Sequence, residues 1–168
     1  MEKLKYPRPQ LIRKKWFDFN GKWQFTFDDE NKGEDNKQYL NNDFYNTAFS
    51  DTEKNEICTT NIIAEDNFES GTDAGNDTQD KVFLLSISEV ETYFSSDEER
   101  MCKPSKHAIN NGVFEYVDSY EGNCWWWLRS PGTALNYASY IYGGGIVVYD
   151  GEGVDFGHAI RPAMWITV

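Results

Sequence analysis

The sequence is short of the residues that build metal centres and disulfide frameworks. Three cysteines and two histidines occur among its 168 residues. Cys58, Cys102 and Cys124 form no CxxC pair, and neither His107 nor His158 has a second potential metal ligand three to five positions further on. An odd number of cysteines excludes a complete disulfide framework, and a zinc site needs three or four ligands. The sequence therefore predicts no metal and no cofactor; one disulfide with a free thiol, or three reduced thiols, both stay open.

Basic residues are also scarce. Sixteen Lys and Arg face 28 Asp and Glu, which gives a net charge of −12. A domain of this charge repels phosphate groups, which argues against a nucleic-acid partner. No apolar run approaches the roughly 20 residues that span a bilayer, and the opening MEKLKYPRPQ lacks the apolar core of a signal peptide. We expect one cytoplasmic domain of ordinary size, without a membrane span.

Two capping pairs predict where helices begin in the middle of the chain. Apolar residues recur at helical spacing over 40–49, and Ser50 with Glu53 then begins a second short helix. Ser86 with Glu89 is the same kind of pair and begins a helix that runs through Phe94. The remaining segments are predicted as strands at 59–64, 82–85 and 113–117, a polar connection at 95–100 and a short helix at 104–109.

An acidic loop rich in glycine and asparagine occupies residues 65–80. Calcium binds six to eight oxygen atoms, so these carboxylates invite a calcium interpretation. Their spacing differs from that of the helix-loop-helix calcium motif, and the sequence favours a solvated loop. The carboxylates are those of Glu65, Asp66, Glu69, Asp73, Asp77 and Asp80.

The last third of the chain joins two apolar runs through a segment rich in tyrosine and glycine. The first run, WWWL at 125–128, is stopped by the turn signal Ser-Pro-Gly, and the second occupies 163–168 and contains Trp165. Between them, residues 133–158 are rich in Tyr, Gly, Ser and Asn, the residue types of a paratope. We expect the two runs to be structural anchors and the segment between them to be a recognition surface.

The tryptophans and two arginines have separate expected roles. In a strand, Trp125 and Trp127 share one face and Trp126 lies on the other. We expect Trp125 and Trp127 to be structural, and Trp126 to form the floor of the binding surface. Arg129 and Arg161 each close one apolar run, and a guanidinium with five donors suits loop carbonyls or a buried carboxylate.

Four stretches, in order, resemble the bacterial DUF6273 family. They are YLNNDFYNTAFSDTEKNEI (39–57), TQDKVFLLSISEVETYF (78–94), KPSKHA (103–108), and WWLRSPG (126–132) with RPAMWI (161–166). The resemblance covers residues 38–168 and implies a C-type-lectin-like fold, related to formylglycine-generating enzymes and to the variable proteins of diversity-generating retroelements. It thus implies an α+β domain with small twisted antiparallel sheets, two main helices and long loops.

Residues 1–34 have a different character. Aromatic and polar residues alternate over 23–27, as in a half-buried strand, and 16–19 can pair with it across Asn20-Gly21. The stretch YPRPQLIRKKWFDFNGKWQFTFDDENKGE resembles the start of glycoside hydrolase family 2, whose barrel and catalytic glutamates have no counterpart here. We therefore divide the chain into residues 1–34, a β-hairpin that pairs with the C-terminal strand, and residues 35–168, the DUF6273-like domain.

We expect a non-enzymatic domain of bacterial type that binds a protein or a glycan through the surface 133–158. The candidate ligand-binding residues are Trp126, Asn136, Tyr137, Tyr140, Tyr142, Tyr149, Asp150, Asp155, Phe156 and His158. Several belong to the set that retroelement variable proteins diversify, although ordinary tyrosine-rich hairpins have the same composition.

Two alternatives stay open. One is an enzyme, either a relative of glycoside hydrolases or a formylglycine-type oxidase, although no cysteine lies in a motif that matches the oxidases. The other is a chimeric or accessory domain without activity of its own.

Overall fold

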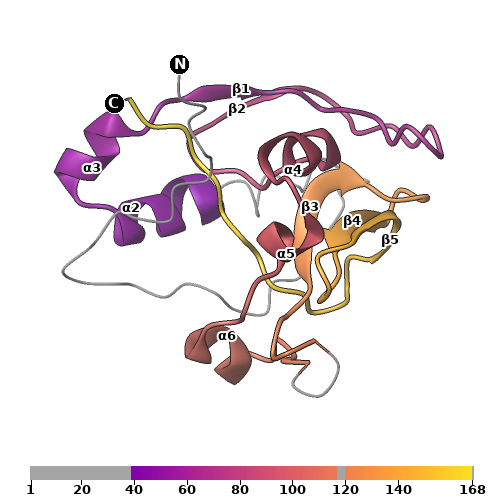
Figure 1. The fold of residues 1–168 in the computed structure, drawn as a ribbon. Coiled ribbons are helices and arrows are strands. Elements are labelled where there is room, and N and C mark those ends of the chain that lie inside the picture. The colour runs from indigo at the N-terminus through magenta and orange to yellow at the C-terminus, as the bar shows by residue number, and fades with distance from the viewer. Residues whose placement is uncertain (1–38, 117–119, 168) are drawn as a thin grey trace.

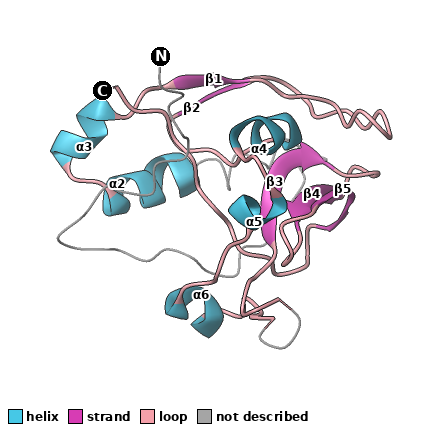
Figure 2. Ribbon diagram, viewed as in Figure 1, coloured by secondary structure: helices cyan, strands magenta, loops and turns pink. Residues whose placement is uncertain are grey.

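The computed structural model describes residues 39–116 and 120–167, which form short helices and two small antiparallel sheets (Figures 1 and 2). This mixture confirms the predicted α+β class. The hairpin predicted over 16–27, its pairing with the C-terminal strand, and the boundary at residue 34 lie outside the described residues.

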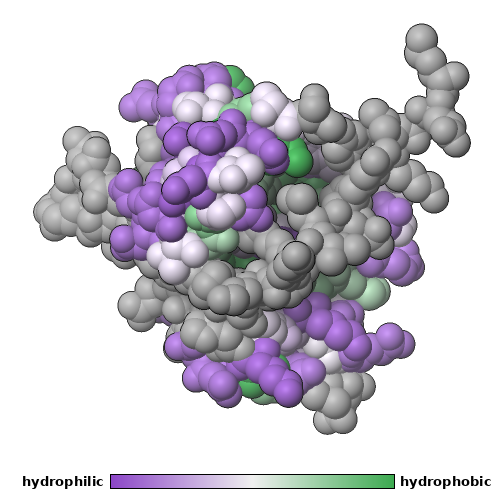
Figure 3. All heavy atoms as spheres, turned by 90° about the vertical axis from the view of Figure 1, so that its left-hand side faces the viewer, coloured by the Kyte–Doolittle hydropathy of each residue, from purple (hydrophilic) through white to green (hydrophobic). Residues whose placement is uncertain are grey.

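The described chain begins with helical turns, as predicted. A π-helical turn, η1 (Tyr39–Phe44), continues into α2 (Tyr45–Ala48), and α3 (Asp51–Glu56) follows. The Ser50 Oγ accepts a hydrogen bond from the Glu53 N–H at 3.4 Å, and the Glu53 carboxylate accepts one from the Ser50 N–H at 2.9 Å, which is the predicted capping pair. Helix α3 buries none of its residues, and the side of the molecule on which it lies is mainly hydrophilic (Figure 3). The helix-spaced residues Phe44, Tyr45, Ala48 and Phe49 are buried together.

A narrow ribbon of two strands follows. β1 (Thr60–Ile62) pairs antiparallel with β2 (Thr78–Asp80). Residues 63–77 connect them, so the loop predicted over 65–80 ends before residue 78 and its last three residues form β2. The side chain of Asn41 fixes the end of the ribbon, because its Oδ1 accepts hydrogen bonds from the N–H groups of Lys81 at 2.7 Å and Val82 at 3.1 Å. The helical segment therefore holds the ribbon through backbone groups that would otherwise lack partners.

Three short helices occupy the middle of the chain: α4 (Ile87–Tyr93), α5 (Asp97–Arg100) and α6 (Lys106–Asn110). Helix α4 begins at the predicted pair, in which Ser86 Oγ accepts from the Glu89 N–H at 3.2 Å and the Glu89 carboxylate accepts from the Ser86 N–H at 2.9 Å. The segment predicted as a polar connection contains α5, whose acidic first turn suits a helix N-terminus.

The second sheet has the order β3-β4-β5, all antiparallel, with β3 (Trp126–Pro131), β4 (Tyr137–Ile141) and β5 (Val147–Gly153). Strand β3 ends at Pro131, inside the turn signal Ser130-Pro131-Gly132 that was predicted to stop the apolar run. The strand pair shifts register before that residue, and the Ser139 hydroxyl donates a hydrogen bond to the Pro131 carbonyl at 2.9 Å. The hydroxyl thus gives the Pro131 carbonyl a hydrogen-bond partner where the strand pairing is irregular.

The two faces of β3 pack into different parts of the core, as the predicted alternation requires. Trp126 and Leu128 belong to the cluster formed with Val90 and Phe94. Trp127 belongs to the opposite cluster, on which Trp125 packs. Helix α4 covers one side of the sheet, and the ribbon β1–β2 passes above that helix (Figure 1).

The C-terminal segment runs as an extended chain between the α2–α3 region and α4–α5 (Figure 1). Isolated bridges join Ala163 to Phe83 and Ile166 to Ile57. Residues 82–85 and 163–167, which lie in the strands predicted at 82–85 and 163–168, are therefore extended segments with isolated bridges rather than full strands. Each bridge joins one residue to one partner, so these segments do not form a continuous ladder of hydrogen bonds.

Candidate functional site

The start of β3 brings several aromatic rings onto one face of the sheet. The register places Trp127 opposite Tyr140. Residues two apart in a strand share a face, so Trp125 and Tyr142 lie on the same side as this pair. The rings of Trp125 and Tyr142 are 4.5 Å apart between centroids. The short loop after β4 therefore presents its tyrosine directly to the first tryptophan.

The chain before β3 supplies further rings. A backbone bridge joins Tyr116 to Asn123, with Tyr116 N–H donating to the Asn123 carbonyl at 3.1 Å. The Asn123 side-chain amide donates to the Gly143 carbonyl at 3.2 Å, which ties this turn to the loop after β4. A Cβ at Gly143 would lie 3.0 Å from the ring of Tyr120, so the absence of a side chain lets that ring approach. Two tyrosines before β3 thus reach the tryptophan face.

The rings form a continuous stack. Tyr116 lies parallel to Trp125, with centroids 4.9 Å apart and planes 4° apart. Tyr140 also stacks on Trp125, at 5.3 Å, and Phe114 packs edge-on against Tyr116 at 4.6 Å. Offset stacked and edge-on arrangements are those that aromatic quadrupoles favour. We name these residues the aromatic cluster: Phe114, Tyr116, Tyr120, Trp125, Tyr140 and Tyr142.

The cluster runs from solvent into the core. Phe114 is 64% exposed, Tyr116 and Trp125 are half-buried, and Tyr140 is only 8% exposed. Tyr120 and Tyr142, in edge-on contact at 4.9 Å, are also half-buried. The inner rings are consequently fixed by the core, while the outer rings offer a preorganised surface.

Three tyrosines of the cluster, Tyr116, Tyr140 and Tyr142, have a raised pKa. Burial, with a smaller effect of the Glu152 carboxylate, raises the pKa of Tyr140 to about 12. The same two causes raise the pKa of Tyr116. The hydrogen bond with Tyr120 raises the pKa of Tyr142, with burial as the second cause. Each hydroxyl therefore remains a hydrogen-bond donor as well as an acceptor.

A polar pair lies behind the rings. His158 is 8% exposed, and its ring centroid lies 4.2 Å from that of Trp127 and 4.9 Å from that of Tyr140. Burial lowers the pKa of His158 to about 4, and burial raises the pKa of Glu152. The contact of 2.9 Å between His158 Nε2 and the Glu152 carboxylate is therefore a hydrogen bond donated by a neutral imidazole, not a salt bridge.

The indole N–H of Trp125 is buried and has no hydrogen-bond partner within residues 39–116 and 120–167. A buried donor without an acceptor costs roughly 1–3 kcal/mol. The centre of the cluster thus contains a buried polar group that the described chain leaves unsatisfied.

The residues that the sequence assigned to one ligand-binding surface lie in different parts of the structure. Trp126 is fully buried, and Tyr140 is nearly so, which corrects their expected place on the ligand-facing surface. The reason is that Trp126 faces the α4 side of the sheet, where it donates its indole N–H to the Arg100 carbonyl at 3.0 Å. Trp125, expected to be purely structural, is instead the ring at the centre of the cluster.

The other predicted residues lie elsewhere. Tyr149 faces the α4 side, packs edge-on against Phe68 at 5.3 Å, and donates its hydroxyl to Glu91. The β3–β4–β5 register places Asn136 and Tyr137 at the end of the sheet opposite Trp125. The exposed members at or near that opposite end are Asn136, Tyr137, Asp150, Asp155 and Phe156.

Sequence reasoning missed three members of the cluster: Phe114, Tyr116 and Tyr120. Phe114 and Tyr116 lie in the segment 113–117, which we treated only as a strand and which forms a bridge at Tyr116; Tyr120 lies beyond that predicted strand. The alternation of Phe114 and Tyr116 amid acidic residues was the available signal, because it places two rings on one side of an extended chain.

Of the two predicted arginine pins, Arg129 makes the expected carbonyl and carboxylate contacts, whereas Arg161 reaches the Arg100 carbonyl only at 3.5 Å and lies over two aromatic rings. Arg129 donates to the Leu84 carbonyl at 2.9 Å and pairs with the Glu89 carboxylate. The Arg161 guanidinium lies 4.9 Å from the Phe94 ring centre and 5.1 Å from that of Trp126. Trp165, the third anchor, is 40% exposed and packs edge-on against Tyr93.

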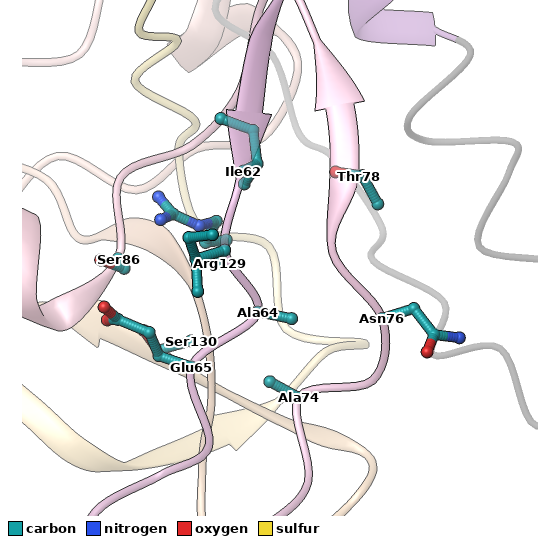
Figure 4. A pocket seen from close by; sticks show the side chains of 10 residues that line it. Ile62, Ala64, Glu65, Ala74, Asn76, Thr78, Ser86, Arg129 and Ser130 are labelled. Atoms are coloured by element: carbon teal, nitrogen blue, oxygen red, sulfur yellow. The ribbon is translucent and has the colours of Figure 1, made fainter.

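A small cavity of about 140 Å³ separates the ribbon from the start of α4 and β3 (Figure 4). Arg129 and Glu65 line it, together with Ser86 and Ser130. These groups already have structural partners: Ser130 Oγ accepts from the Ile87 N–H at 2.9 Å, and Ser86 caps α4. We therefore interpret the cavity as a packing gap beneath the ribbon.

The acidic loop uses several carboxylates to hold its own backbone. Asp77 accepts from the Ala64 N–H at 2.9 Å, and Asp66 accepts from the Ala74 N–H at 3.0 Å. Within the described residues, no group of three or more His, Cys, Asp and Glu side chains is placed to hold a metal ion.

The chain matches the family described as a domain of unknown function, DUF6273, over residues 11–168, and it belongs to that family. The match begins inside the segment that resembles the glycoside hydrolases. Neither the curated proteins nor the solved structures contain a significant match to the chain. Among the described residues, no helix has the length and apolar character needed to cross a membrane.

Proposed function

We propose that this DUF6273 domain is a non-enzymatic recognition domain that binds a glycan at the aromatic cluster. The observation that carries the proposal is the graded burial of the stack, from the exposed Phe114 to the buried Tyr140. Partly exposed aromatic patches on a fixed base are typical of interaction sites, where Trp and Tyr dominate the binding energy.

The chemistry of the cluster favours a sugar over other ligands. The faces of aromatic rings carry negative partial charge, and the C–H face of a pyranose is complementary to them. The hydroxyls of Tyr116, Tyr120 and Tyr142 can donate to sugar oxygens or accept from sugar hydroxyls. A protein ligand is the second candidate, since tyrosine-rich surfaces also bind proteins.

We further propose that the fold is C-type-lectin-like. The small antiparallel sheet, the long connections and the helices on one side of the sheet support this proposal. The ligand surface then differs from the one expected at 133–158, because it combines the loop after β4 with the turn before β3.

The test is a screen of immobilised glycans followed by calorimetry on any glycan that binds. Tyr116→Ala and Tyr120→Ala each remove a half-buried ring without emptying the core. Each should weaken binding at least ~10-fold, which corresponds to about 1.4 kcal/mol. Phe68→Ala, which removes an exposed ring on the other side of the sheet, should leave the affinity unchanged.

Three outcomes would contradict the proposal. The first is the absence of any glycan ligand while a displayed-peptide library yields a binder, which would favour the protein ligand. The second is an equal loss of affinity in Phe68→Ala, which would move the site to the surface around Tyr149. The third is unchanged affinity in both tyrosine variants once circular dichroism has shown that they fold.

A further inference from the structure

Two of the three cysteines meet across the chain. Cys102 follows α5, and Cys124 lies 22 positions later, just before β3. The Cys124 N–H donates to the Cys102 carbonyl at 2.8 Å, and the Cys124 thiol lies 3.4 Å from the same oxygen. A disulfide requires Cα atoms roughly 4.4–6.8 Å apart, and this direct backbone contact brings the two cysteines side by side.

The two cysteines also influence each other's ionisation. The neighbouring Cys124 thiol is the main reason that the pKa of Cys102 falls to about 7; burial opposes the shift and the nearby Arg161 charge adds to it. The neighbouring Cys102 thiol, together with burial, raises the pKa of Cys124. Cys102 is half-buried, whereas Cys124 is 1% exposed. One thiol is therefore accessible and ionisable, and its neighbour is protected.

We propose that Cys102 and Cys124 form a redox-active dithiol that closes to an intramolecular disulfide by exchange with a low-molecular-weight disulfide such as oxidised glutathione. The site is independent of the proposed glycan binding. It uses two residues that lie outside the aromatic cluster.

The exchange balances in two steps. The Cys102 thiolate attacks one sulfur of oxidised glutathione, which forms a mixed disulfide and releases one glutathione thiolate. The Cys124 thiol then loses its proton and attacks the Cys102 sulfur, which breaks the mixed bond and releases the second glutathione. The two cysteines lose two electrons and two protons in total, and one glutathione disulfide becomes two glutathione thiols.

The third cysteine provides an internal control. Cys58 follows α3, far along the chain from the pair, and its thiol faces the Glu56 carbonyl at 4.0 Å. Because no second cysteine is described beside Cys58, its oxidation would stop at a mixed disulfide, and a Cys58→Ser variant should retain the exchange.

The test exposes the folded protein to glutathione buffers of increasing oxidised fraction, blocks free thiols, and maps the products by mass spectrometry without reduction. The wild-type protein and Cys58→Ser should lose two hydrogen atoms and yield a peptide cross-linked at Cys102 and Cys124. Cys124→Ser should keep one glutathione on Cys102. Oxidation should also raise the melting temperature of wild type by roughly 5–10 °C, because the bond closes a loop of moderate length.

The cysteine products mapped in the wild-type protein test the proposal even if a variant fails to fold. A lasting glutathione adduct on Cys102 in the wild type would overturn the proposal, since it would show that Cys124 cannot attack. A cross-link that includes Cys58, or three unmodified thiols under oxidising conditions, would overturn it as well.

Discussion

Lowering the pH should destabilise this protein through His158. Burial lowers the pKa of the folded-state imidazole to about 4, whereas an unfolded histidine has a pKa of about 6.5. The unfolded chain therefore binds a proton between these values that the folded chain does not bind. The stabilising contribution is complete above the unfolded pKa and is lost as the pH falls towards the folded pKa.

The size of the effect follows from the difference in pKa. About 2.5 units at 1.36 kcal/mol each give a loss on the order of 3 kcal/mol in the free energy of unfolding. The groups that face the imidazole include the Glu152 carboxylate, to which it donates, and the rings of Trp125, Trp127 and Tyr140. Glu152 contributes with the opposite sign, because its pKa is raised in the folded state.

A matched variant separates the two contributions. His158→Gln keeps an N–H donor for Glu152 but cannot bind a proton in this range. Urea unfolding, followed by tryptophan fluorescence between pH 7 and pH 4, should show the wild type losing about 3 kcal/mol relative to the variant. Parallel stability curves for the two proteins would refute the assignment, as would an NMR titration that places the His158 pKa near 6.5.

The remaining predictions concern packing and charge. Gly145→Ala should destabilise the protein by more than about 2 kcal/mol, because φ is +83° and the new Cβ would lie 1.8 Å from the Asp97 carbonyl oxygen. Gly75→Ala, with φ of +82° and nothing within 4 Å, should cost only about 1 kcal/mol; equal urea midpoints for the two variants would contradict this reasoning. Arg129→Met should cost roughly 2–4 kcal/mol because it leaves Glu89 unpaired. Adding Glu89→Gln should recover part of the lost free energy of unfolding. A double variant that is less stable than Arg129→Met alone would show that the unpaired Glu89 charge is not the cause.

Local patterns determined the parts of this fold whose interactions are close in sequence. Ser50 with Glu53, and Ser86 with Glu89, begin helices because both members of each pair lie within one turn. The alternation of Trp126 with Trp127 follows from strand geometry alone, so the two faces of β3 could be assigned before any partner was known. The acidic composition of the 65–80 segment likewise predicted a long polar connection.

Tertiary structure decided which of these faces is accessible. Sequence places Trp125 and Trp127 together but cannot show that α4 covers the side occupied by Trp126. The predicted strand at the C-terminus depended on a continuous partner, and the fold provides only isolated bridges at Ala163 and Ile166.

The candidate site depended on contacts between distant segments. Tyr116 reaches Trp125 because a bridge to Asn123 turns the chain back, and Tyr142 reaches the same ring through the β3–β4 register. Cys102 meets Cys124 for the same kind of reason. The spacing of residues in the sequence predicts which side chains share a face of one helix or strand. Which helices and strands pair with each other depends on the folded chain as a whole.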